Sequence, residues 1–114
     1  MKSFAQTIDL LNNPKLIKKY EEYHRNVWPE VINGLKVIGI ERMEIFRIGN
    51  HLFMYCNAKD DFDPNTDFPK YTQTHPKADE WNDLMSKFQE KVPEAGLGDW
   101  WAPMKLAFDS EWFE

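Results

Sequence analysis

The stretch ERMEIFRIGNHLFMYCNA, residues 41–58, predicts two antiparallel strands joined by a tight turn. Apolar side chains recur through Glu41–Ile48 and through Leu52–Ala58. The dipeptide Gly49-Asn50 between the two runs suits a two-residue β-hairpin. This hairpin therefore places a sheet in the middle of the chain.

The hairpin has apolar side chains on both of its faces. In a strand successive side chains alternate, so Leu52, Met54 and Cys56 share one face while Phe53 and Tyr55 share the other. Neither face is polar throughout. We therefore expect each face of the sheet to be covered, one by helices and the other by a second subunit.

The residues before the hairpin predict a strand followed by a helix. Phe4, Ile8 and Leu10, with polar residues between them, indicate the strand. Asn13-Pro14 is an N-cap followed by proline at the first helical position, and Pro29 must kink or restart the helix because it has no amide hydrogen. The apolar stripe of this helix is Leu16, Ile17, Tyr20, His24, Val27 and Val31.

The residues after the hairpin predict a long connection, a second helix and a last strand. Residues 59–76 contain four aspartates and three prolines, which indicates an irregular connection of the kind that often forms a functional lid. Thr74-His75-Pro76 indicates a helix start, and Met104, Leu106 and Phe108 alternate as in a strand. The stripe of the second helix is Trp81, Leu84, Met85, Phe88 and Val92.

The order strand, helix, strand, strand, helix, strand predicts an α+β fold, the ferredoxin-like βαββαβ sandwich with an antiparallel sheet. Both helices cover one sheet face. Covering the other face with a second copy gives a homodimer, a dimeric α/β-barrel-like assembly. A chain of 114 residues is one domain's length, so residues 1–114 are expected to form a single domain.

Composition narrows the classes of partner. A net charge of −5 argues against nucleic acid and anionic membranes, which both require basic patches. The N-terminus lacks the apolar core of a signal peptide and no run is long enough to span a membrane, which predicts a cytoplasmic protein. Cys56, the only cysteine, is expected to be a small packed side chain.

Tyr20 and His24 are the leading candidates for chemistry. At a spacing of four residues on a helix they share one face, so a phenol and an imidazole can point into one pocket. Histidine titrates near neutral pH and is suited to acid or base catalysis, whereas tyrosine, with a pKa of about 10, is better suited to orienting a substrate. Taken alone, such a pair is more often packed in a core than catalytic.

The motifs Tyr20-x-x-x-His24 and Trp28-Pro29-Glu30, with Gly39, Trp81 and the apolar final strand, resemble the L-rhamnose mutarotase family over nearly the whole chain. The resemblance implies a small ferredoxin-like homodimer that interconverts the α and β anomers of a 6-deoxy sugar without a cofactor. It also implies that His24 is the catalytic proton donor and that Tyr20 binds the sugar.

Two sugar contacts depart from the family pattern. Trp81 matches the first residue of a Trp-Trp pair that contacts the sugar, but Asn82 occupies the second place. Met43 stands where the family has a substrate-contacting tyrosine. The resemblance therefore implies sugar-binding positions at Trp81, Asn82 and Met43 and leaves L-rhamnose, L-fucose or a related hexose as the substrate.

Several alternatives are weighed against this interpretation. The segment from Asp61 to Thr72 lacks the glycine and glutamate of a calcium loop, and the three histidines lie on separate elements, so no metal site is expected. His51 is expected to be solvated and His75 to cap a helix. A cofactor-free monooxygenase and a non-catalytic sugar-binding module stay open, because fold alone does not decide function.

Overall fold

The computed structural model describes residues 2–113. Its strands are β1 Lys2–Leu10, β2 Ile40–Ile48, β3 His51–Ala58, β4 Gln89–Glu90 and β5 Ala102–Pro103. Its helices are α1 Pro14–Arg25, α2 Pro29–Ile38, α3 Pro64–Asp67 and α4 Pro76–Ser86, with 3₁₀ turns at Phe68–Gln73 and Ser110–Phe113. No helix among these residues is both long and apolar enough to span a bilayer.

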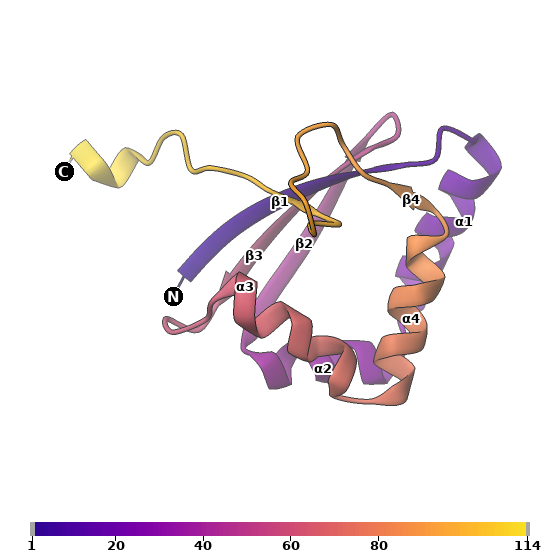
Figure 1. Ribbon diagram of the computed structural model, residues 1–114, viewed down its shortest axis with the longest axis horizontal. Coiled ribbons are helices and arrows are strands. Elements are labelled where there is room, and N and C mark those ends of the chain that lie inside the picture. The colour runs from indigo at the N-terminus through magenta and orange to yellow at the C-terminus, as the bar shows by residue number, and fades with distance from the viewer. Residues whose placement is uncertain (1, 114) are drawn as a thin grey trace.

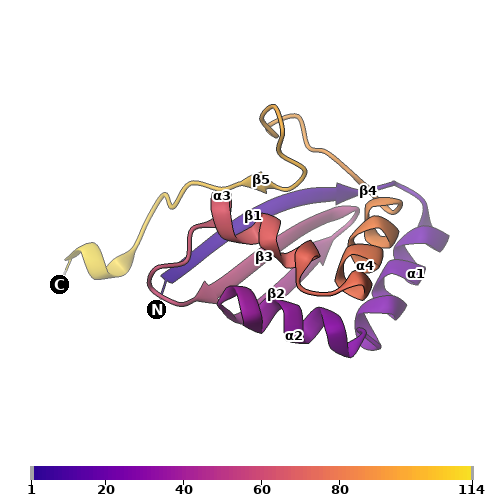
Figure 2. The ribbon, with the colours of Figure 1, turned by 60° about the horizontal axis from the view of Figure 1, so that its bottom comes forward.

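The strands form one antiparallel sheet in the order β2-β3-β1-β4, and β5 also pairs with β1. Helices α1, α2 and α4 lie on one face of this sheet (Figures 1 and 2). The predicted ferredoxin-like α+β fold is confirmed, with the first predicted helix divided into α1 and α2.

The central hairpin forms as predicted. Ile48 pairs with His51, so Gly49 and Asn50 are the two turn residues. The φ of +58° at Gly49 suits the first central position of a type II′ turn, which favours glycine. Register then places Cys56 of β3 beside Phe4 of β1, and the hairpin is joined to the first strand along its whole length.

Local signals also set the helix boundaries. The Asn13 side chain accepts hydrogen bonds from the amides of Lys15 and Leu16, and Pro14 begins α1. Helix α2 begins at Pro29 and ends at Ile38, and its C-cap is Gly39, whose φ of +106° is a left-handed conformation that glycine adopts without strain. The proline break therefore turns the chain so that two short helices follow the curved sheet.

The connection at residues 59–76 is more ordered than predicted. It contains α3 and the 3₁₀ turn at Phe68–Gln73 rather than an irregular loop. Phe62 is fully buried and its ring lies 5.4 Å from the rings of Phe4 and Phe68. Because these rings pack in the core, the segment is anchored at its middle, which the count of aspartates and prolines did not reveal.

The predicted last strand at residues 104–108 is wrong. Sheet pairing ends with Pro103 opposite Gln6, the Met104 amide donates to the carbonyl oxygen of Ala5, and the chain then leaves the sheet (Figure 1). Leu106 and Phe108 are exposed. Alternating apolar and polar residues indicate that one side of a segment is apolar, but they do not indicate which surface buries that side.

The buried residues form two clusters on the helix-covered side of the sheet. The first, around Tyr20 and Trp81, also contains Ile8, Leu10, Val31, Leu52, Met85 and Phe88. The second contains Ile38, Ile40, Met54, Cys56, Ala58 and Phe62. Trp101, Ile45 and Tyr71 are partly buried and pack against both clusters, so they join the two halves of the core.

Candidate functional site

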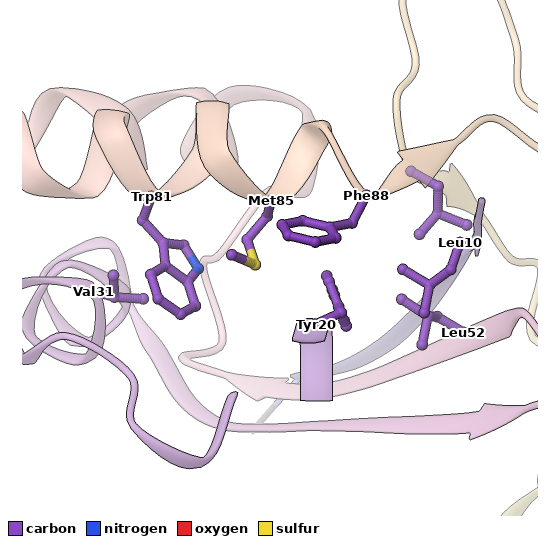
Figure 3. Close-up of a cluster of buried hydrophobic side chains, with 8 residues drawn as sticks. Leu10, Tyr20, Val31, Leu52, Trp81, Met85 and Phe88 are labelled. Carbon is purple, nitrogen blue, oxygen red and sulfur yellow. The ribbon is translucent and has the colours of Figure 1, made fainter. Parts of the chain in front are cut away.

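Helices α1 and α4 bring Tyr20, His24 and Trp81 together. Tyr20 and His24 lie one turn apart on α1, and their ring centroids are 4.3 Å apart. Trp81 comes from α4, and its ring meets that of His24 edge-on at 5.5 Å. Figure 3 shows Trp81 and Tyr20 pointing into the same cluster from opposite sides. The spacing of four residues on α1 therefore places imidazole and phenol in one site, as predicted from the sequence.

Other aromatic rings hold Trp81 in place. Its centroid lies 5.1 Å from that of Trp28 and 6.0 Å from that of Tyr23, both near-perpendicular contacts. Trp28 precedes the proline break and thus anchors the start of α2 against α4. With His24, these rings surround Trp81, which is only 6% exposed.

His24 has a defined hydrogen-bonding state. Its Nδ1 lies 2.9 Å from the carbonyl oxygen of Tyr20. A carbonyl can only accept, so Nδ1 carries the hydrogen and Nε2 of the neutral ring has a free lone pair. Burial lowers the pKa of His24 and the bond to the Tyr20 carbonyl raises it in part. The half-buried imidazole therefore favours its neutral form, with Nε2 able to accept a proton.

Tyr20 is a buried hydrogen-bond donor and acceptor. Burial raises the pKa of Tyr20 to about 12, and a hydrogen bond from Gln89 lowers it in part. The Gln89 side-chain nitrogen lies 3.2 Å from the Tyr20 hydroxyl oxygen. The phenol keeps its hydrogen at neutral pH, which suits it to orienting a substrate rather than to acting as a base.

Met43 and Asn82 lie outside this group of rings. Met43 is on β2 and packs against the second core cluster. Asn82 follows Trp81, but a helix turns about 100° per residue, and Asn82 lies on the exposed side of α4. The structure brings together Tyr20, His24 and Trp81, and it does not bring Met43 or Asn82 to the same point.

Tyr71 is a feature that the sequence did not single out. Among residues 2–113 its hydroxyl is the one buried side-chain nitrogen or oxygen atom without a hydrogen-bond partner. Its ring packs against both core clusters, close to the backbone of α2 at Gly34, where a Cβ would lie 3.2 Å from Cε1 of Tyr71. Such an unpaired group is rare in a core, and a bound ligand would satisfy it.

The remaining candidate groups have structural surroundings. His75 Nδ1 accepts a hydrogen bond from the Lys77 amide, which confirms its predicted role as a helix cap. His51 is exposed and paired with Asp9 at 2.7 Å. Cys56 is fully buried, and burial raises the pKa of its thiol to about 12. Residues 2–113 hold no group of three or more His, Cys, Asp or Glu side chains placed to bind a metal ion.

Comparisons with known proteins identify the family of this chain. The family model for L-rhamnose mutarotase matches residues 3–110. A UPF0734 protein of Dictyostelium discoideum is 54% identical over 99% of this chain and 93% of its own length. An L-fucose mutarotase of Xanthomonas campestris is 35% identical over 89% of this chain and 82% of its own.

A solved structure shares the fold. The L-rhamnose mutarotase of Formosa agariphila superposes with a TM-score of 0.69 at 22% identity, covering 96% of this chain and 98% of that one. The family model spans nearly all of the sequence, including the helix that carries Tyr20 and His24. This chain belongs to the L-rhamnose mutarotase family.

Proposed function

We propose that this protein is an isomerase that interconverts the α and β anomers of a 6-deoxy hexose, L-rhamnose or L-fucose. The observation that carries the proposal is His24, whose Nδ1 is held by the Tyr20 carbonyl while Nε2 is left to exchange a proton beside Trp81. Two mutarotases of such sugars are among the related proteins, which supports this choice of substrate.

In the proposed reaction His24 is the catalytic residue. Nε2 takes the proton of the anomeric hydroxyl, and the C1–O bond to the ring oxygen breaks as the carbonyl forms. The resulting imidazolium is then the proton donor to the ring oxygen, which leaves an open-chain aldehyde and a neutral imidazole. Rotation about C1–C2 and the reverse steps close the ring on the other face. Each proton thus returns to the sugar, and no cofactor is consumed.

The other site residues bind the sugar in this proposal. The Tyr20 hydroxyl donates a hydrogen bond to a sugar oxygen, and the Trp81 ring contacts the apolar face of the sugar. Asn82 and Met43 replace aromatic residues of the family pattern and lie away from Tyr20, His24 and Trp81. We propose that the loss of these two aromatic contacts changes which 6-deoxy sugar is accepted.

The test is anomer exchange by saturation-transfer proton NMR on L-rhamnose and L-fucose, with no metal added. Faster exchange with catalytic amounts of protein supports the proposal, and the faster sugar names the better substrate. Sugar binding without faster exchange would indicate a binding module instead. Oxygen uptake with a phenolic substrate, without sugar exchange, would indicate a monooxygenase.

We further propose that the Tyr71 hydroxyl supplies the sugar contact that Met43 lacks. Replacing Tyr71 with phenylalanine removes a buried hydroxyl that has no partner among residues 2–113, so the free energy of unfolding should stay equal or rise. The KM for the sugar should rise about two- to tenfold, the equivalent of one neutral hydrogen bond. Urea denaturation and NMR exchange measure the two effects.

Tyr55→Phe is the matched control for this experiment, because Tyr55 lies on the opposite face of the sheet. Its KM should not change. A Tyr71→Phe variant that unfolds more easily and keeps its KM would show that the hydroxyl has a structural partner and no sugar contact.

We also propose that two copies form a homodimer through the sheet face that the helices leave open. Phe46 and Phe53 are cross-strand neighbours on this face with ring centroids 6.1 Å apart, and Ile48 beside them is 78% exposed. The C-terminal segment adds further exposed apolar side chains: Met104, Leu106, Phe108, Trp112 and Phe113. A second copy with the same face would bury these groups.

Light scattering at micromolar concentration should give twice the 13.6 kDa mass of one chain. The double variant Phe46→Asp, Phe53→Asp places two charges in the proposed interface and should shift the mass to one chain. Val37→Asp, at an even more exposed apolar site on α2, should leave the mass unchanged. A monomeric wild type would rule out the interface.

A further inference from the structure

A chain of hydrogen bonds reaches the candidate site from the C-terminal part of the fold. The indole Nε1 of Trp100 donates to Oε1 of Gln89 at 2.8 Å, and Nε2 of Gln89 donates to the Tyr20 hydroxyl oxygen at 3.2 Å. Gln89 lies on β4, paired with Leu10 of β1, and it is the one buried polar side chain of the described core, at 8% exposed.

The direction of this chain is determined by its first member. An indole N–H can only donate, so Trp100 turns the oxygen of the Gln89 amide toward itself. The amide nitrogen then has to face Tyr20, and the Tyr20 oxygen accepts. A phenol carries a single hydrogen, which is therefore not needed for Gln89 and is left for another acceptor.

The surroundings of Tyr20 limit where that acceptor can be. Its ring packs on the His24 ring at 4.3 Å on one side and meets the edge of Phe88 at 6.0 Å on another. Phe88 offers no acceptor. Nδ1 of His24 is bonded to the backbone carbonyl of Tyr20, and the described residues show no hydrogen bond between the Tyr20 hydroxyl and the His24 ring. A ligand bound against His24 would provide the missing acceptor.

We propose that Gln89 is a positioning residue, oriented by Trp100, that makes the Tyr20 hydroxyl a hydrogen-bond donor to the bound sugar. This inference rests on the proposed mutarotase function. It gives residues 89 and 100 a part in binding the substrate, although both lie outside the sequence motif of α1. Because burial keeps the Tyr20 phenol protonated, the donor persists across the neutral pH range.

Trp100→Phe tests this inference, because it keeps a smaller aromatic ring and removes the indole donor. The Gln89 amide can then turn its oxygen toward Tyr20, and the phenol donates to Gln89 instead of to the sugar. We expect kcat/KM for anomer exchange to fall about two- to tenfold, the effect of one neutral hydrogen bond. Leu97→Ala, at a fully exposed residue of the same loop, is the control and should leave kcat/KM unchanged.

A double-mutant cycle separates this effect from a general loss of stability. In the Tyr20→Phe variant the donor is already absent, so adding Trp100→Phe should not slow exchange any further. Equal losses from Trp100→Phe with and without the Tyr20 hydroxyl would overturn the inference. Gln89→Met provides a second test, since it removes both the donor and the acceptor of the side-chain amide. It should also have no effect on exchange once Tyr20 is replaced by phenylalanine.

A spectroscopic measurement tests the hydrogen-bond chain without depending on activity. With tyrosines labelled by ¹³C at the carbon that carries the hydroxyl, the Tyr20 signal is the one lost in Tyr20→Phe. It should shift in Trp100→Phe while the Tyr55 signal stays in place. An unchanged Tyr20 signal together with unchanged exchange would overturn the inference and leave the proposed function standing. A wild type that exchanges neither sugar would instead overturn the proposed function, before any variant is compared.

Discussion

Anomer exchange should slow by about a hundred- to ten-thousand-fold when His24 is replaced by asparagine, the usual contribution of a general acid or base. An asparagine amide can keep the hydrogen bond to the Tyr20 carbonyl, so the variant removes the titrating ring while preserving the local contact. Saturation-transfer NMR at equal protein concentration measures the loss, and circular dichroism checks that the variant is folded.

His51→Asn is the matched control for this prediction. His51 is exposed at the hairpin and pairs with Asp9, so its loss should leave exchange unchanged. If His24→Asn keeps full activity, His24 is not the proton-transfer group, and the catalytic proposal fails for this residue while the family assignment remains.

The same residue predicts a pH dependence. Burial places the pKa of His24 below 6.5, and Nε2 has to be neutral to take the first proton, so exchange should fall as pH drops through that lowered pKa. The free energy of unfolding should also fall as the pH drops. Below pH 6.5 the unfolded chain binds a proton that the folded His24 resists, and the free energy of unfolding decreases. The His24→Asn variant should lose this part of the pH dependence.

Trp81→Ala should lower the free energy of unfolding by about 3–5 kcal/mol, which is typical of removing a buried tryptophan. Trp81 contacts His24, Tyr23 and Trp28 through its ring, so truncation leaves a cavity between α1, α2 and α4. Small domains are stable by about 5–15 kcal/mol, so much of the protein's stability would be lost. Urea denaturation measures the change.

Phe62 provides the comparison that separates packing from sugar contact. It is fully buried in the second core cluster, and Phe62→Ala should destabilise the protein by a similar amount. Under conditions where both variants are folded, Phe62→Ala should keep its KM for the sugar, whereas the milder Trp81→Phe should raise it. An unchanged KM in Trp81→Phe would limit Trp81 to a packing role.

Local sequence signals predicted much of the fold and part of the candidate site. Gly49-Asn50, Asn13-Pro14 and Pro29 act through φ preferences and missing or added hydrogen bonds within a few residues. Their effects do not depend on the rest of the chain, and the turn and helix starts lie where they were predicted. The helical spacing of Tyr20 and His24 is local in the same sense.

The strands that pair with the free edge of β1 were not predicted, because their sequences show no local strand pattern. They are the short strands β4 and β5, two residues each, on either side of a loop that contains Pro93, Gly96 and Gly98. Two residues are too few to show alternation. The alternating residues 104–108 were predicted as the last strand, but they leave the sheet after Met104.

The sequence by itself determined the central hairpin, the starts of α1, α2 and α4 and the shared helix face of Tyr20 and His24, because each depends on neighbours within one or two turns. It did not determine the end of α4, which stops at Ser86, before Phe88 and Val92 of the predicted stripe. Only the tertiary structure decided that Trp81 closes against His24, that Asn82 faces outward and that Gln89 bonds to Tyr20 across 69 residues of chain. Such contacts depend on how helices and strands pack against one another. The direction of the Trp100–Gln89–Tyr20 chain follows from donors and acceptors that meet only in the folded protein.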